Sequence, residues 1–178
     1  LPFDTNRLAV CNYAFNVAHF RSTSTPTTPV ELLPPGQQRI NSFYDNKTVS
    51  SRLGYDVDES FSLNWIGRYT DAQLRSVGDN GNNWPVTPAA EQTVQTSHQL
   101  TTRGEAVWTL LDGRIKNFFG VNYTSLYRSI YDPYTYDPNT WAYTPQATSY
   151  NGERLKYDWR SVIQVMPGQT LVLGADQQ

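Results

Sequence analysis

The sequence predicts an all-β protein, an antiparallel up-and-down meander of about seven strands that belongs to a larger transmembrane β-barrel. Three observations support this prediction. Most of the chain alternates apolar and polar residues with the period of two that a strand imposes. Charged residues inside these runs gather on one face. The expected connections alternate between long loops and short turns, which is typical of outer-membrane barrels with short periplasmic turns and long extracellular loops.

A hairpin over residues 100–127 is the clearest local signal. Asp112-Gly113 joins two alternating runs, and this dipeptide favours a type I′ turn because both central residues need positive φ. Trp108 falls on the apolar face of the first run, whereas Arg103 and Glu105 fall on the other face. Each run spans about ten residues, close to the length with which a tilted strand crosses a bilayer.

The remaining strands follow from the same alternation. We expect them at residues 9–20, 48–57, 61–70 and 153–165, with a last strand beginning at Thr170. Short turns are expected at residues 58–60 and 166–169. Long loops are expected at residues 21–44, 71–97 and 128–151, where the alternation dissolves.

The two faces of these strands differ in charge. A cation facing lipid near the bilayer midplane costs roughly 2–4 kcal/mol, so a lipid-facing surface should exclude it. The charged residues expected to face the barrel lumen are Arg52, Arg68, Arg103, Glu105, Lys116, Arg154, Lys156, Asp158 and Arg160. The opposite face is rich in Tyr and Trp, as in the aromatic girdles at a membrane interface. A soluble core would have to satisfy the polar group of each ring.

The composition argues against several classes of function. The formal net charge is −2, and no basic patch predicts nucleic-acid binding. With Cys11 as the single cysteine and His19 and His98 as the two histidines, we expect no disulfide framework, metal site or cofactor. No catalytic motif such as Gly-x-Ser-x-Gly occurs, so the sequence does not predict an enzyme.

Three stretches resemble successive hairpins in the barrel of TonB-dependent outer-membrane receptors. They are SRLGYDVDESFSLNWIGRYT at 51–70, TRGEAVWTLLDGRIKNFFGVNYT at 102–124 and GERLKYDWRSVIQVMPGQTLVLGAD at 152–176. The resemblance covers most of the chain from Asp45 onward. It implies a barrel of about 22 strands with a plugged lumen. On this interpretation, residues 1–178 form an internal part of the barrel domain, and the plug that contacts the TonB complex is absent from them.

The resemblance further implies import of a scarce nutrient, such as a ferric siderophore or cobalamin, across the bacterial outer membrane. The expected partners are outer-membrane lipid, the TonB complex through the plug, and a small-molecule cargo such as a metal chelate. Aromatic residues in the expected external loops are candidate cargo contacts, because these loops meet a ligand first. They are Trp84, Tyr131, Tyr134, Tyr136, Trp141 and Tyr143.

Several alternatives remain open from the sequence. The basic residues of the polar face would favour an anionic cargo, or else they pair with carboxylates of the wall or plug. A plug-less porin or other channel would show the same strand pattern. A soluble β-sandwich that binds carbohydrate could use the aromatic residues between Tyr127 and Tyr150 to stack on sugar rings.

Overall fold

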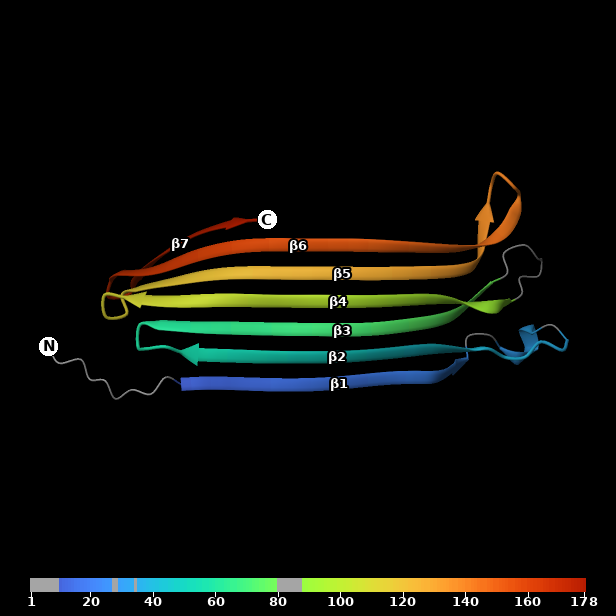
Figure 1. Ribbon diagram of the computed structural model, residues 1–178, viewed down its shortest axis with the longest axis horizontal. Helices are drawn as coiled ribbons and strands as arrows, with labels where there is room; N and C mark the ends of the chain where they lie inside the picture. The colour runs from blue at the N-terminus through green and yellow to red at the C-terminus, as the bar shows by residue number, and fades with distance from the viewer. Residues whose placement is uncertain (1–9, 27–28, 34, 80–87) are drawn as a thin grey trace.

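The described residues form one antiparallel sheet (Figure 1). The computed structural model describes residues 10–26, 29–33, 35–79 and 88–178. The strand order in space is the order in sequence, so each strand pairs with its neighbours along the chain. β1 and β7 form the two edges, and the sheet is open. The predicted all-β class and the predicted meander of seven strands are confirmed.

The strands are much longer than the alternation suggested. They are β1 (Val10–Pro26), β2 (Asn41–Asp56), β3 (Phe61–Asp79), β4 (Pro88–Leu110), β5 (Ile115–Asp137), β6 (Ala142–Met166) and β7 (Gln169–Gln177). The longest, β6, has 25 residues. A short 3-10 helix, η1 (Val30–Leu32), lies between β1 and β2. In the described part of the chain, no helix has the length and apolar character needed to cross a membrane.

Much of the chain expected to form long loops is strand, which corrects the sequence prediction. β5 continues to Asp137 and β6 begins at Ala142, so a short turn replaces most of the loop expected at 128–151. Tyrosine and threonine are frequent in this stretch, and both fit a pleated surface well. β1 and β2 extend into the loop expected at 21–44, and β3 and β4 extend into the one expected at 71–97.

A β-bulge bends the β5–β6 hairpin. Pairing is regular as far as Asp132 opposite Gln146 and resumes at Thr135 opposite Thr144. Pro133 lies in the irregular segment and has no N–H to donate to the neighbouring strand. The Asp132 carboxylate accepts a hydrogen bond from the Tyr134 N–H at 3.0 Å. Beyond this point the tip of the hairpin turns away from the rest of the sheet, at the upper right of Figure 1.

The short turns form where the sequence predicted them. Asp112 and Gly113 have positive φ angles of 50° and 90°, and the Arg114 N–H donates to the Leu111 carbonyl at 3.1 Å. At the turn between β2 and β3, the Asp58 carboxylate accepts hydrogen bonds from the Ser60 hydroxyl and backbone N–H, both at 2.7 Å. The Ser60 hydroxyl, followed by the backbone donors, holds the pKa of Asp58 below its ordinary value.

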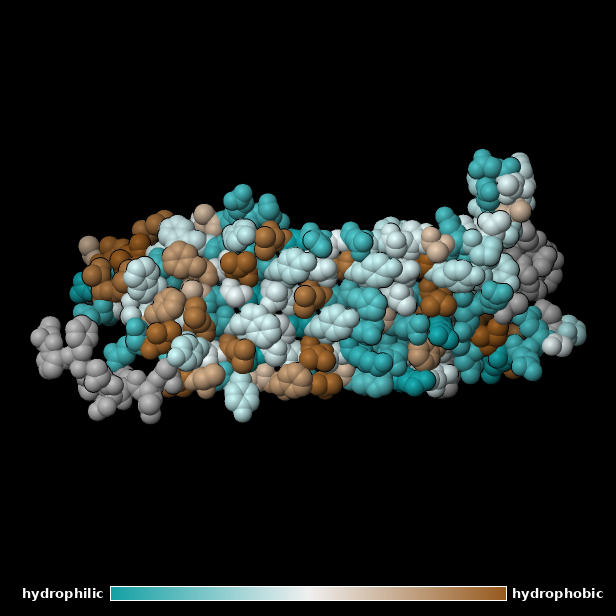
Figure 2. All heavy atoms as spheres, in the orientation of Figure 1, coloured by the Kyte–Doolittle hydropathy of each residue, from teal (hydrophilic) through white to brown (hydrophobic). Residues whose placement is uncertain are grey.

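The described residues contain no buried apolar core. No large side chain is fully buried among them, because a single sheet has no second layer packed on either face. Large apolar side chains are instead exposed: Tyr13 is 81% exposed and Phe15 is 69% exposed. Figure 2 shows that brown apolar residues gather toward the short-turn end of the visible face, whereas teal residues predominate toward the opposite end. A β-sandwich needs two packed sheets, and the described residues form one.

Candidate functional site

Strand register places all the predicted charged residues on one face of the sheet. Arg52 lies opposite Ile66, and Ile66 lies opposite Arg103. Arg103 in turn lies opposite Asn122, which lies opposite Lys156. Side chains an even number of residues apart on a strand share a face. The other residues of the set are related in this way to Ile66, Arg103, Asn122 or Lys156 and lie on the same face: Arg68, Glu105, Lys116, Arg154, Asp158 and Arg160. We call this surface the polar face.

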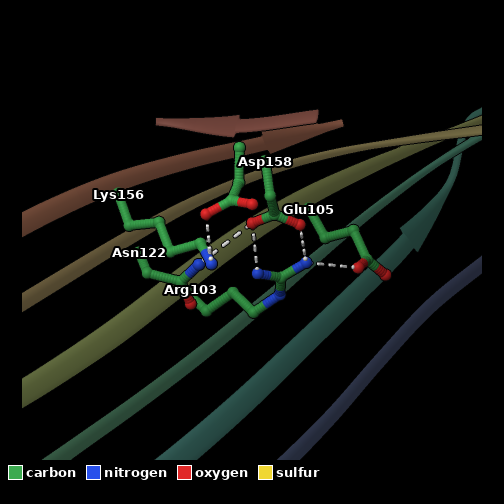
Figure 3. Close-up of polar contacts among 6 residues, drawn as sticks. Arg103, Glu105, Asn122, Lys156 and Asp158 are labelled. Atoms are coloured by element: carbon green, nitrogen blue, oxygen red, sulfur yellow. Dashed lines mark hydrogen bonds and ion pairs between the residues drawn. The ribbon is translucent and has the colours of Figure 1, made fainter. Parts of the chain in front are cut away.

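Arg103 on β4 is the centre of an ion-pair cluster on the polar face (Figure 3). Its Nη1 and Nη2 donate to Oδ2 and Oδ1 of Asp158 at 2.7 and 2.9 Å. Nη2 also donates to Glu105 Oε2 at 2.8 Å. The Asn122 side-chain amide donates to Asp158 Oδ2 at 3.1 Å. Side chains from β4, β5 and β6 are therefore held in one hydrogen-bonded group.

Gly120 on β5 provides the space for this group. It lies directly opposite Glu105 on β4 and Asp158 on β6. A Cβ atom at Gly120 would lie 2.5 Å from Arg103 Nη2 and would also collide with the Asp158 carboxylate. The Arg103–Asp158 pair therefore crosses over β5 because the intervening residue has no side chain.

A depression of about 600 Å³ opens beside this cluster, between β4 and β7. Its lining includes Arg154, Lys156 and Arg160, together with the carboxylates of Asp158 and Asp176. Lys156 Nζ lies 2.9 Å from Asp176 Oδ2, so this cation is neutralised within the lining of the depression. The Arg160 guanidinium lies over the Phe118 ring, 4.4 Å from its centroid. The depression therefore combines paired cations with a cation held by an aromatic ring.

The aromatic residues predicted to contact cargo are distributed along the β5–β6 hairpin. Tyr136 and Tyr143 pair across the strands with ring centroids 5.5 Å apart. Trp141 lies in the turn at the tip and is 82% exposed. Tyr131 lies on β5 before the bulge, opposite Ala147, and Tyr134 lies within the irregular segment. Trp84 lies outside the described residues. The structure thus brings two of these rings into contact.

Sequence reasoning missed a second charged cluster, on the face opposite the polar face. His19 Nε2 lies 3.1 Å from Asp45 Oδ2, and His98 Nδ1 lies 3.2 Å from Asp71 Oδ1. The hydrogen bond with His19, followed by the neighbouring charges, holds the pKa of Asp45 below its ordinary value. Asp45 lies on the same face as Val49, four residues away, but outside the strand predicted at residues 48–57. Extending the period of two further along the chain would have revealed this cluster.

Among the described residues, no group of three His, Cys, Asp or Glu side chains is placed to hold a metal ion. No family model, no curated protein and no solved structure matches this chain. The likeness to TonB-dependent receptors therefore rests on the sequence patterns quoted above.

Proposed function

We propose that this chain forms part of the barrel wall of an outer-membrane importer of the TonB-dependent kind, which takes up a scarce nutrient such as a metal chelate. The observation that carries the proposal is the division of one continuous sheet into two unlike faces. One face exposes a band of apolar and aromatic side chains, and the other carries the ion pairs around Arg103. A transmembrane barrel wall has this division between lipid and lumen.

The apolar band has dimensions that suit a bilayer. On β3 it extends from Phe61 to Tyr69 and includes Leu63 and Trp65. At a rise of ~3.3 Å per residue this stretch measures about 26 Å along the strand. A strand tilt of about 40° reduces it to about 20 Å, comparable with the ~25 Å apolar band of outer-membrane barrels. The paired strands continue the band in register, with Leu53 and Tyr55 on β2 and Leu100 on β4.

The open edges of the sheet are consistent with a larger barrel. β7 pairs with β6 only from Tyr157 onward, so the stretch of β6 from Ala142 to Lys156 has one edge without a partner strand among the described residues. Within the apolar band, the free edges lie at residues 10–17 of β1 and 153–156 of β6, where unpaired backbone groups would be costly in hydrocarbon; closed barrels avoid them. The proposal therefore includes further strands that pair with β1, β6 and β7.

The polar face would act as a passive guide for cargo in this scheme. Exposed aromatic residues such as Trp141 offer a first contact surface at the hairpin tip. The depression beside Arg103 presents Arg154 and Arg160 to a passing anion. The energy for transport would come from the TonB complex through a plug domain, as the sequence resemblance implies.

A plug-less channel is the second candidate, because it needs the same apolar band and polar wall. The two functions differ in whether uptake of the cargo requires energy from the TonB complex. We would express the complete protein that carries this chain in bacterial cells and measure uptake of a radiolabelled ferric chelate, with and without an active TonB complex. We expect the protein in the outer-membrane fraction and uptake at background level without TonB. Uptake that does not depend on TonB would support the channel, and a protein soluble without detergent would refute both membrane proposals.

A further inference from the structure

The apolar face changes character beyond the apolar band, away from the short turns. On β2, Lys47 lies two residues beyond Val49 in this direction and on the same face. On β1, Arg21 lies four residues beyond Val17 and on the same face. Arg75 on β3 lies directly opposite Phe43 on β2. We call Arg21, Lys47 and Arg75, which lie around Phe43, the outer basic cluster. It faces the same side as the aromatic residues of the band.

Two cations of this cluster, Arg21 and Lys47, are held loosely. Asp45 has His19 as its close neighbour, at 3.1 Å, whereas Arg21 Nε and Lys47 Nζ approach its carboxylate only to 4.0 and 3.9 Å. Arg21 and Lys47 are also 58% and 62% exposed. Their donors therefore remain largely available to another anion.

Phe43 brings two of these cations together. The guanidinium groups of Arg21 and Arg75 both lie over its ring, 5.2 and 5.5 Å from the centroid. Two like charges held around one ring, from the strands on either side of β2, raise the local positive potential, which favours an anionic partner. Guanidinium groups also match the oxygen geometry of a phosphate better than a point charge does.

A depression of about 330 Å³ lies within this region. Arg21, Lys47 and Phe43 contribute to its lining, with Gln73 and Thr96 as further polar side chains. The carboxylates of Asp45 and Asp71 also line it, and each has a histidine ring nitrogen close by, at 3.1 and 3.2 Å. The depression is therefore large enough for a head group and rich in side chains that can donate hydrogen bonds.

The cluster begins at the height of the head-group layer and continues above it. Lys47, Arg21 and Arg75 lie about 7, 13 and 20 Å along their strands beyond Val49, Val17 and Tyr69. Strand tilt reduces these heights to about 5, 10 and 15 Å, and the polar layer on each side of a bilayer is about 5–8 Å thick, so Lys47 lies within this layer and the two arginines lie above it. Long Lys and Arg side chains can adjust the remaining distance.

We propose that the outer basic cluster binds the phosphate of an anionic lipid head group while the apolar band lies in the hydrocarbon. This inference rests on the proposed membrane function, and it adds a specific lipid as a ligand of the outward face. Lipid is favoured over a soluble anion because the depression opens on the face that carries the apolar band, where acyl chains would lie beside a bound phosphate.

The test uses the complete protein purified in a zwitterionic detergent. Retained lipid is measured by native mass spectrometry during titration with short-chain phosphatidic acid, short-chain phosphatidylcholine or inorganic phosphate. We expect phosphatidic acid to bind at least tenfold more tightly than phosphatidylcholine, and millimolar inorganic phosphate not to displace it.

Arg21→Gln should weaken phosphatidic acid binding roughly fivefold and Arg21→Gln/Lys47→Gln by more than tenfold, given the typical contribution of a cation near a lipid surface. Arg128→Gln, which removes the same charge from the opposite face, should leave binding unchanged.

A second measurement separates the lipid site from membrane insertion. Brominated lipids in vesicles should quench the tryptophan fluorescence of the wild type and of each variant if the band is inserted. Quenching together with equal phosphatidic acid affinity in all variants would overturn the lipid site and leave the barrel proposal standing. The absence of quenching would overturn both proposals. Displacement by inorganic phosphate would identify a free-anion site and overturn the assignment to lipid.

Discussion

Arg103 and Asp158 form a bidentate ion pair although a complete strand separates β4 from β6. The two contacts measure 2.7 and 2.9 Å, and they pass over Gly120 on the intervening strand β5. The side chains of Arg103 and Asp158 are 32% and 25% exposed, so water screens this pair only partly. The pair links β4 to β6 across β5 on the polar face, so its removal tests how this part of the sheet is stabilised.

A double-mutant cycle with Arg103→Gln and Asp158→Asn should give a coupling energy of about 1–3 kcal/mol, because charge-assisted bidentate contacts are stronger than neutral ones. The measurement is the free energy of unfolding in urea for the complete protein reconstituted in lipid vesicles. The Arg103→Gln/Glu105→Gln cycle serves as the comparison, since Glu105 makes a single contact at 2.8 Å. Equal coupling in the two cycles would contradict the expectation that the bidentate contact with Asp158 is stronger than the single contact with Glu105.

Gly120→Ala should destabilise the protein by about 1 kcal/mol, since the new methyl group would force the Arg103–Asp158 pair apart. Gly152→Ala is the matched control, because it also lies on the polar face and a Cβ there meets no atom within 4 Å. Both changes reduce backbone freedom equally, so the difference between them isolates the effect on the pair. The same urea titration provides the values, and indistinguishable variants would show that the pair can shift without loss.

Leu63→Arg tests the assignment of the apolar face to lipid. This side chain lies within the band on β3, between its centre and its short-turn end, where an arginine should reduce the free energy of unfolding by roughly 1–3 kcal/mol in vesicles. Asn64→Arg places the same group one residue further along the strand, on the polar face, and should cost less than about 1 kcal/mol. If the two substitutions have equal effects, the two faces do not meet different environments.

Asp58→Asn should remove a pH-dependent part of the stability at the turn between β2 and β3. Hydrogen bonds from Ser60 and from the Phe61 N–H hold the pKa of folded Asp58 below its unfolded value of about 3.9. A lowered folded-state pKa stabilises the fold above the unfolded pKa, and this contribution is lost as the pH falls through the folded-state pKa. The stability difference between wild type and Asp58→Asn should therefore be larger at pH 7 than at about pH 2.5. A difference that does not change between these pH values would show that the charge of Asp58 does not stabilise the turn.

The alternation of side chains determined the class of fold and the residues of each face. These features are local, because the period of two along a strand fixes which side chains point together whatever the strand pairs with. Turn chemistry was equally local: Asp112-Gly113 and Asp58 formed the turns that their residue types favour. Strand ends were less predictable, because the tyrosine-rich stretch after Tyr127 resembles a loop in composition and becomes a strand only when β5 and β6 pair.

The tertiary structure alone decided which charges meet. The sequence placed Arg103, Glu105 and Asp158 on one face, but the register of β4, β5 and β6 brought them together and set Gly120 between them. The same is true of Arg21, Phe43 and Arg75, which come from three strands and meet beyond the apolar band. Such contacts depend on residues far apart in the chain. A shift of one residue in the pairing would move a strand's side chains to the opposite face, so the register rather than the local pattern determines both clusters.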